Sequence, residues 1–96
     1  MIKESVLEQR LVKGAKNLDC FVRKIQFISH NGCPDRLLIT PTGYLFWVEM
    51  KTAKGRLSTA QRRELELLQR YGQRIYVLTS VGEIDGFLEM LKCYLT

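Results

Sequence analysis

The residues best suited to chemistry lie in two short segments near the middle of this sequence. Asp35 ends a Gly-x-Pro-Asp loop, and Glu49 and Lys51 frame a Glu-x-Lys motif. Alternate side chains of a strand point to the same face, so Glu49 and Lys51 share a face and Met50 points to the other. Two carboxylates held close together are costly unless a cation or a proton compensates them. Oxygen ligands of this kind suit Mg²⁺ or Mn²⁺, which can bridge a phosphate and activate water.

A predicted hairpin brings these segments together. The loop 30–35 contains Asn-Gly and Pro, which interrupt regular structure. Two largely apolar runs, 36–40 and 44–50, flank a short turn and predict a pair of antiparallel strands. Antiparallel pairing would place Asp35 beside the Glu49 end of the second strand. We therefore expect two carboxylates and one ammonium to converge at one end of a sheet, with the second strand in its interior.

The remaining elements predict an α/β fold with a mixed four-stranded sheet flanked by helices, in one domain spanning residues 1–96. Ser58 is a good helix N-cap and Gly72 stands where that helix would close. On that helix Leu65, Leu68 and Tyr71 share the face expected to be buried. The predicted order is αβββαβα, with helices at 2–17, 59–71 and 81–95 and further strands at 20–27 and 74–78.

The charge, length and cysteine content of the chain indicate which kinds of partner and cellular setting to expect. Fifteen Lys and Arg against ten Asp and Glu give a net charge of +5, which suits a polyanion partner without requiring one. A chain of 96 residues buries a modest core, so self-association is expected. Three scattered cysteines without a CxxC pair favour reduced thiols in a soluble, cytoplasmic protein. No apolar stretch approaches the roughly 20 residues that cross a bilayer, so no membrane partner is expected.

Other conspicuous side chains are given ordinary structural roles. A zinc site is not expected, because His30 is the sole histidine and no ligand cluster forms around it in the sequence. His30 is also disfavoured as a general base, since water activated by a metal needs no imidazole. Phe46 and Trp47 are expected in the core or at an interface rather than stacked on bases.

Three ordered motifs resemble the VRR-NUC nuclease domain, a branch of the restriction-endonuclease-like PD-(D/E)xK superfamily. The motifs are residues 32–36, 48–51 and 57–61, and the opening residues 4–6 and 11–13 also match, so the resemblance covers about residues 3 to 80. It implies a restriction-endonuclease-like fold and metal-dependent hydrolysis of DNA. Small stand-alone members of viral origin are homo-oligomers that act on branched DNA, particularly four-way (Holliday) junctions. The resemblance thus implies a homo-oligomer, with a dimer favoured, encoded by a phage or prophage.

The resemblance also implies roles for individual residues. Asp35 and Glu49 would be ligands of Mg²⁺ or Mn²⁺, and the Met50 carbonyl would be a further ligand. Lys51 would be catalytic. Gln61, at the start of the second long helix, would support the site.

The family's helix-one glutamate corresponds best to Glu4, with Glu8 as its competitor for the metal. Both glutamates lie in the first turns of a helix, where they also complement the helix dipole. The position of Cys33 varies within the family, so no function is expected for it.

A basic cluster close to Lys51 could contact phosphates that flank the cleavage site, although a solvated basic face explains it equally well. The leading hypothesis is a structure-specific, metal-dependent DNA endonuclease. The alternative is a catalytically silent DNA-binding module that retains the nuclease fold and binds DNA without cutting it. A third possibility, a small interaction domain, predicts affinity for neither metal nor DNA. The basic residues are Lys54, Arg56, Arg62 and Arg63.

Overall fold

The computed structural model describes residues 2–52 and 54–96, and its helices and strands follow the predicted order αβββαβα. In the described chain the strands form one mixed sheet in the order β1-β2-β3-β4. The pairs β1–β2 and β2–β3 are antiparallel, whereas β3–β4 is parallel, so β3 is interior as predicted. The elements are α1 (Glu4–Asn17), β1 (Phe21–Lys24), β2 (Arg36–Ile39), β3 (Leu45–Met50), α2 (Thr59–Arg70), β4 (Arg74–Leu78), α3 (Val81–Leu91) and the 3₁₀ turn η1 (Lys92–Tyr94).

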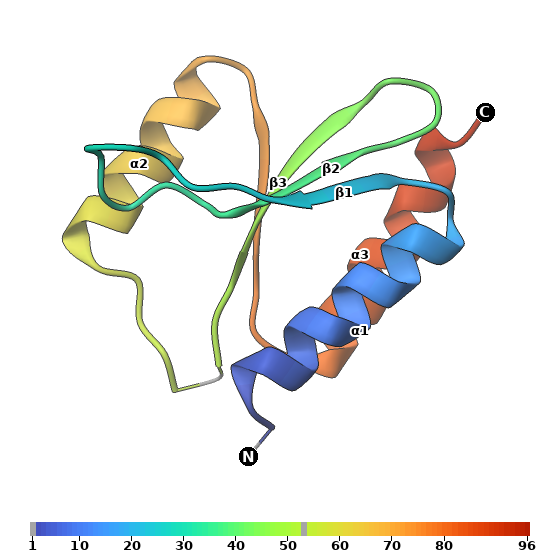
Figure 1. The fold of residues 1–96 in the computed structure, drawn as a ribbon, viewed down its shortest axis with the longest axis horizontal. Helices are drawn as coiled ribbons and strands as arrows, with labels where there is room; N and C mark the ends of the chain where they lie inside the picture. The colour runs from blue at the N-terminus through green and yellow to red at the C-terminus, as the bar shows by residue number, and fades with distance from the viewer. Residues whose placement is uncertain (1, 53) are drawn as a thin grey trace.

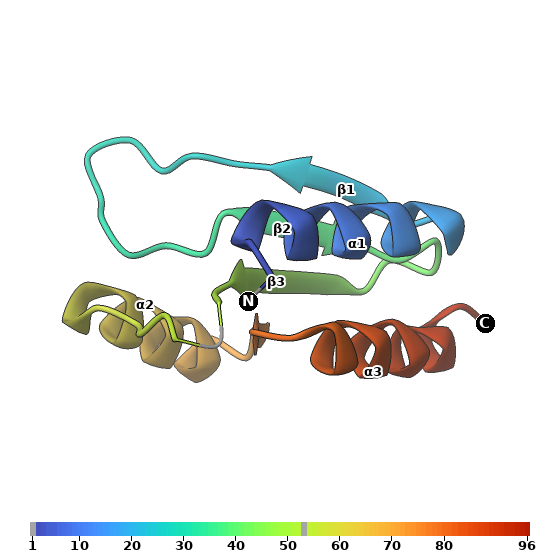
Figure 2. The ribbon, with the colours of Figure 1, turned by 90° about the horizontal axis from the view of Figure 1, so that it is seen from below.

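Helices cover both faces of this sheet. Figure 1 shows α2 on one side of the strands and the pair α1 and α3 on the other, and Figure 2 shows the same separation from below. The main core lies between the sheet and the pair α1 and α3, where Leu11, Phe46, Val48 and Ile84 are fully buried. Period-2 alternation in β3 therefore leaves Trp47 and Glu49 on the opposite face, which is the face of α2.

Both ends of α2 are fixed by local hydrogen bonds. The Ser58 hydroxyl accepts from the Gln61 N–H at 3.1 Å, and the Gln61 side-chain oxygen accepts from the Ser58 N–H at 2.8 Å, which makes a capping box. At the other end Gly72 has a φ of 76°, and its N–H donates to the Gln69 carbonyl at 2.9 Å. The predicted start and stop signals are therefore confirmed.

The first strand is shorter than predicted. It ends at Lys24 instead of residue 27, because its partner β2 begins only at Arg36. One more hydrogen bond, from the Ile25 N–H to the Asp35 carbonyl at 2.8 Å, closes the pairing. Beyond it, the chain leaves the sheet and forms a loop on the same side as α2, a course visible in Figures 1 and 2. This loop, residues 25–35, is called the motif loop below.

Two details of the predicted helices are wrong. Tyr71 is 75% exposed, because it is the C-cap of α2 and lies beyond the last buried turn, which Leu65 anchors. The last helix ends at Leu91 and tightens into η1 rather than continuing to Leu95. In the part of the chain that the structure describes, no helix combines the length and the apolar character needed to span a bilayer.

Candidate active site

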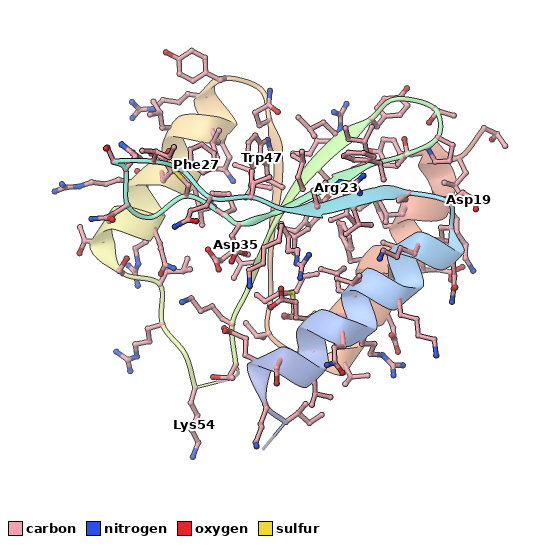
Figure 3. All side chains as sticks on the ribbon, in the orientation of Figure 1. Asp19, Arg23, Phe27, Asp35, Trp47 and Lys54 are labelled. Atoms are coloured by element: carbon pink, nitrogen blue, oxygen red, sulfur yellow. The ribbon has the colours of Figure 1, made fainter. Side chains whose placement is uncertain are left out.

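Two carboxylates face each other across β2 and β3. The register pairs Arg36 with Val48, so one further step places Asp35 directly opposite Glu49. Opposed residues of an antiparallel pair project to the same face. Glu49 is only 8% exposed, whereas Asp35 is half-buried at the mouth of the motif loop, near the middle of the molecule in Figure 3. The structure thus brings together the two carboxylates that the motif spacing singled out.

The electrostatic surroundings of Glu49 reveal which charges converge on it. Burial raises the pKa of Glu49 to about 7, and the negative charge of Asp35 adds to this effect. The charge of Lys51 opposes the shift, while Glu4 and then Glu8 reinforce it. Four acidic groups and one ammonium therefore act on one small region. A buried carboxylate in such a field needs either a proton or a cation.

The end of β3 determines the directions in which the Met50 and Lys51 side chains point. The Met50 side chain is 4% exposed and belongs to the main core, which leaves its carbonyl as the group available at the strand end. The Lys51 N–H donates to the Leu78 carbonyl at 3.0 Å. This bond continues the β3–β4 ladder by one residue and keeps Lys51 on the strand path, so its side chain shares the face of Glu49.

The two glutamates of α1 differ in their partners. An oxygen of Glu8 accepts from the Arg36 guanidinium at 2.7 Å and lies 3.6 Å from the Lys24 ammonium. Lys24 also lies 3.9 Å from an Asp35 oxygen, so it bridges two acidic side chains. Glu4 is exposed in the first turn of α1, and among the described residues it has no ion pair. Glu4 is therefore the helix-one carboxylate that is free to turn toward a ligand.

The other residues expected at the site lie outside this group. The side-chain oxygen of Gln61 is occupied by the Ser58 N–H in the capping box, and the structure gives it no contact with the carboxylates. Figure 3 shows Lys54 projecting away from the body of the molecule, on the connection between β3 and α2. The expected DNA-contacting residues are all exposed: Lys54, Arg56, Arg62 and Arg63.

The aromatic residues of β3 take the structural roles expected of them. Phe46 is fully buried in the main core. Trp47 is half-buried on the face of α2, where its indole N–H donates to the Gln73 side-chain oxygen at 3.0 Å. Its ring lies 6.0 Å from that of Phe27, a contact between β3 and the motif loop that is visible in Figure 3.

The expectation that no ligand cluster surrounds His30 is wrong. His30 and Cys33 of the motif loop both contact Glu64 of α2. Burial and then the Glu64 carboxylate raise the pKa of Cys33 to about 12, and hydrogen bonds from Cys33 and His30 lower the pKa of Glu64. The spacing of His30 and Cys33 was visible in the sequence, but their partner is far away in the chain, so only the fold could reveal the cluster.

Comparisons with known proteins point to one family. The model of the VRR-NUC domain matches residues 6–82. A protein of Acyrthosiphon pisum secondary endosymbiont phage 1, named "Putative nuclease p44", is 30% identical over 80 residues, which cover 83% of this chain and 86% of the relative. A solved structure described as a VRR_NUC domain has a TM-score of 0.74 and 32% identity, and the match covers 85% of this chain and 94% of that one.

Proposed function

Because the chain belongs to the VRR-NUC domain family, we propose that it is a Mg²⁺- or Mn²⁺-dependent endonuclease that hydrolyses phosphodiester bonds in DNA. The observation that carries the proposal is the buried Glu49 opposite Asp35, with a pKa raised to about 7. Such a carboxylate is costly to ionise unless a cation lies beside it. Carboxylate and carbonyl oxygens at this position suit a hard divalent ion better than a soft one.

The carboxylates of Asp35 and Glu49 and the main-chain carbonyl of Met50 would hold the ion. We assign the third carboxylate to Glu4 rather than Glu8. Glu8 is already bound to the Arg36 guanidinium at 2.7 Å, whereas Glu4 has no ion pair among the described residues. The charge of Glu4 also raises the pKa of Glu49 more than that of Glu8 does, so the carboxylate of Glu4 acts more strongly on the site.

When bound, a divalent ion would polarise the scissile phosphate and lower the pKa of the attacking water. Lys51 shares the face of Glu49, so its ammonium can donate to that water or to a phosphate oxygen on which charge develops. Gln61 would support the site indirectly, by capping the start of α2 through the bond that its side-chain oxygen accepts from the Ser58 N–H. The exposed basic side chains after β3 would bind phosphates on either side of the cut. They are Lys54, Arg56, Arg62 and Arg63.

We further propose that the substrate is branched DNA, such as a four-way junction, and that the protein acts as a homodimer. Paired cuts across a junction need two active sites, which a two-fold dimer supplies. The resemblance to small viral members of the family supports this substrate. A phage-encoded protein that acts inside a bacterial host would agree with the phage origin of the 30%-identical relative.

Cleavage assays test the proposal with four-way junction, flapped and linear duplex DNA, each with Mg²⁺, with Mn²⁺ and with a chelator. Lys51→Ala should reduce cleavage by roughly 10²–10³-fold, as expected for losing one donor to developing charge, while DNA binding persists. Lys16→Ala, an exposed lysine at the far end of α1, is the matched control and should cut normally. Salt-sensitive binding of every substrate with no product under any metal would instead support the silent binding module.

A further inference from the structure

A second group of ligand-type side chains lies between the motif loop and α2. The His30 imidazole Nε2 lies 3.0 Å from one Glu64 oxygen, and the Cys33 thiol donates to the other at 3.0 Å. One ligand atom from each residue can be chosen so that all three lie within 4.8 Å of one another. Sulfur, nitrogen and oxygen donors from two separate elements of the fold therefore lie within one small region.

The backbone of the motif loop comes very close to the backbone of α2 beside this cluster. Gly32 has a φ of 89°, and a Cβ at that position would lie 2.5 Å from the carbonyl carbon and oxygen of Ala60. The motif loop thus touches the first turn of α2 through a residue that has no side chain. Because of this contact, Cys33 reaches the same helix one turn further along, where the Glu64 side chain is only 15% exposed.

The donor set differs in kind from that of Asp35 and Glu49. A thiolate, an imidazole and a carboxylate are the ligands that Zn²⁺ takes in proteins, whereas Mg²⁺ prefers oxygen alone. With zinc–ligand bonds of about 2.0–2.3 Å, tetrahedral ligand atoms lie roughly 3.3–3.7 Å apart. The 3.0 Å contacts to the two Glu64 oxygens would therefore open slightly, and donors that now lie up to 4.8 Å apart would move closer together. A cavity of about 670 Å³ borders His30 and Cys33, as well as Asp35, and leaves room for a water on the motif-loop side of the group.

We propose that His30, Cys33 and Glu64 form a zinc site that fastens the motif loop to α2. On binding, a Zn–S bond replaces the S–H bond of Cys33, and the proton is released to solvent. The ion also takes the place of the two hydrogen bonds that now join the loop to Glu64. Because Asp35 follows Cys33 closely in the chain, the zinc site would hold the loop end that presents this carboxylate.

Metal titration of the full-length protein under reducing conditions tests this site. One equivalent of Co²⁺, used as a spectroscopic probe, should give a thiolate-to-cobalt absorption band that Zn²⁺ abolishes. Cys33→Ser should lose the band and weaken zinc binding at least about 100-fold, since even outer-shell partners of a metal account for 10–100-fold. Cys93→Ser, which alters an exposed free cysteine, is the matched control and should keep both.

Further variants keep the test decisive if Cys33→Ser folds poorly. His30→Asn changes a side chain that is 58% exposed and should also weaken zinc binding. Glu49→Gln should leave it unchanged, because it alters only the other group of carboxylates. The zinc site is refuted if wild-type protein gives no thiolate band, if His30→Asn binds zinc as tightly as wild type, or if Glu49→Gln abolishes the binding.

Discussion

Replacing Glu49 by Gln should stabilise the metal-free protein at alkaline pH while it abolishes cleavage. The pKa of Glu49 is about 7 in the folded chain against an ordinary value of 4.5. The folded state therefore holds a proton that the unfolded state releases, so stability falls as pH rises from about 4.5 to 7 and is then constant. Each tenfold difference between the acid dissociation constants of Glu49 in the folded and unfolded states corresponds to about 1.4 kcal/mol, so the free energy of unfolding falls by about 3 kcal/mol between low pH and pH above 7. Gln mimics the protonated side chain and avoids this loss.

Urea unfolding of wild type and Glu49→Gln with chelator present measures the effect. The free energy of unfolding of the variant should exceed that of wild type by about 3 kcal/mol near pH 9, and by less than about 1 kcal/mol near pH 5. Comparing the two proteins at each pH cancels the titration of the groups that do not interact with Glu49. Mg²⁺ should raise the stability of wild type at pH 9 and have little effect on the variant. A difference that does not depend on pH, or a variant less stable at pH 9, would refute the reasoning.

Three further predictions concern the surroundings of the site. Gly32→Ala should lower the free energy of unfolding in a urea titration by about 3 kcal/mol or more, because a left-handed φ is combined with a clash against α2. Gly43→Ala is the control: its φ is 95°, but a Cβ there meets no neighbour, so the same titration should show a loss of only about 1–2 kcal/mol. Ser58→Ala removes an N-cap and should cost about 1 kcal/mol by thermal unfolding, so a neutral result would contradict the capping box. Glu4→Gln should weaken Mg²⁺-dependent cleavage and leave stability unchanged. Glu8→Gln should instead lower the melting temperature, because Arg36 loses the carboxylate that it binds. Weaker cleavage from Glu8→Gln and normal cleavage from Glu4→Gln would transfer the metal role to Glu8.

The sequence predicted the part of the fold that depends on local signals and on alternation. Ser58 and Gly72 marked the ends of α2 correctly, because caps act through neighbouring residues. The apolar run of β3 predicted an interior strand, and the two-residue period predicted that Glu49 would lie on the face opposite Met50, which the structure places in the main core. The facing of Asp35 and Glu49 followed from the hairpin alone, since the turn sets the register.

Features that depend on distant partners were beyond sequence reasoning. The end of β1 at Lys24 depends on where β2 begins. The Glu64 cluster needs the motif loop to cross toward α2, and no local pattern encodes that crossing. Likewise, the ion pair between Glu8 and Arg36 depends on the packing of α1 against the sheet, so the sequence could not show that these two side chains are partners.

The alternation along β3 has a consequence for how this protein can change in evolution. Phe46, Val48 and Met50 face the core while Glu49 faces the opposite side, so an inserted or deleted residue within the strand would turn the apolar side chains outward and the Glu49 carboxylate into the core. Length changes should therefore be excluded from β2 and β3 and better tolerated at Gly43, where the turn is exposed and a Cβ would meet no neighbour. Relatives should differ in length at that turn before they differ anywhere between Arg36 and Lys51.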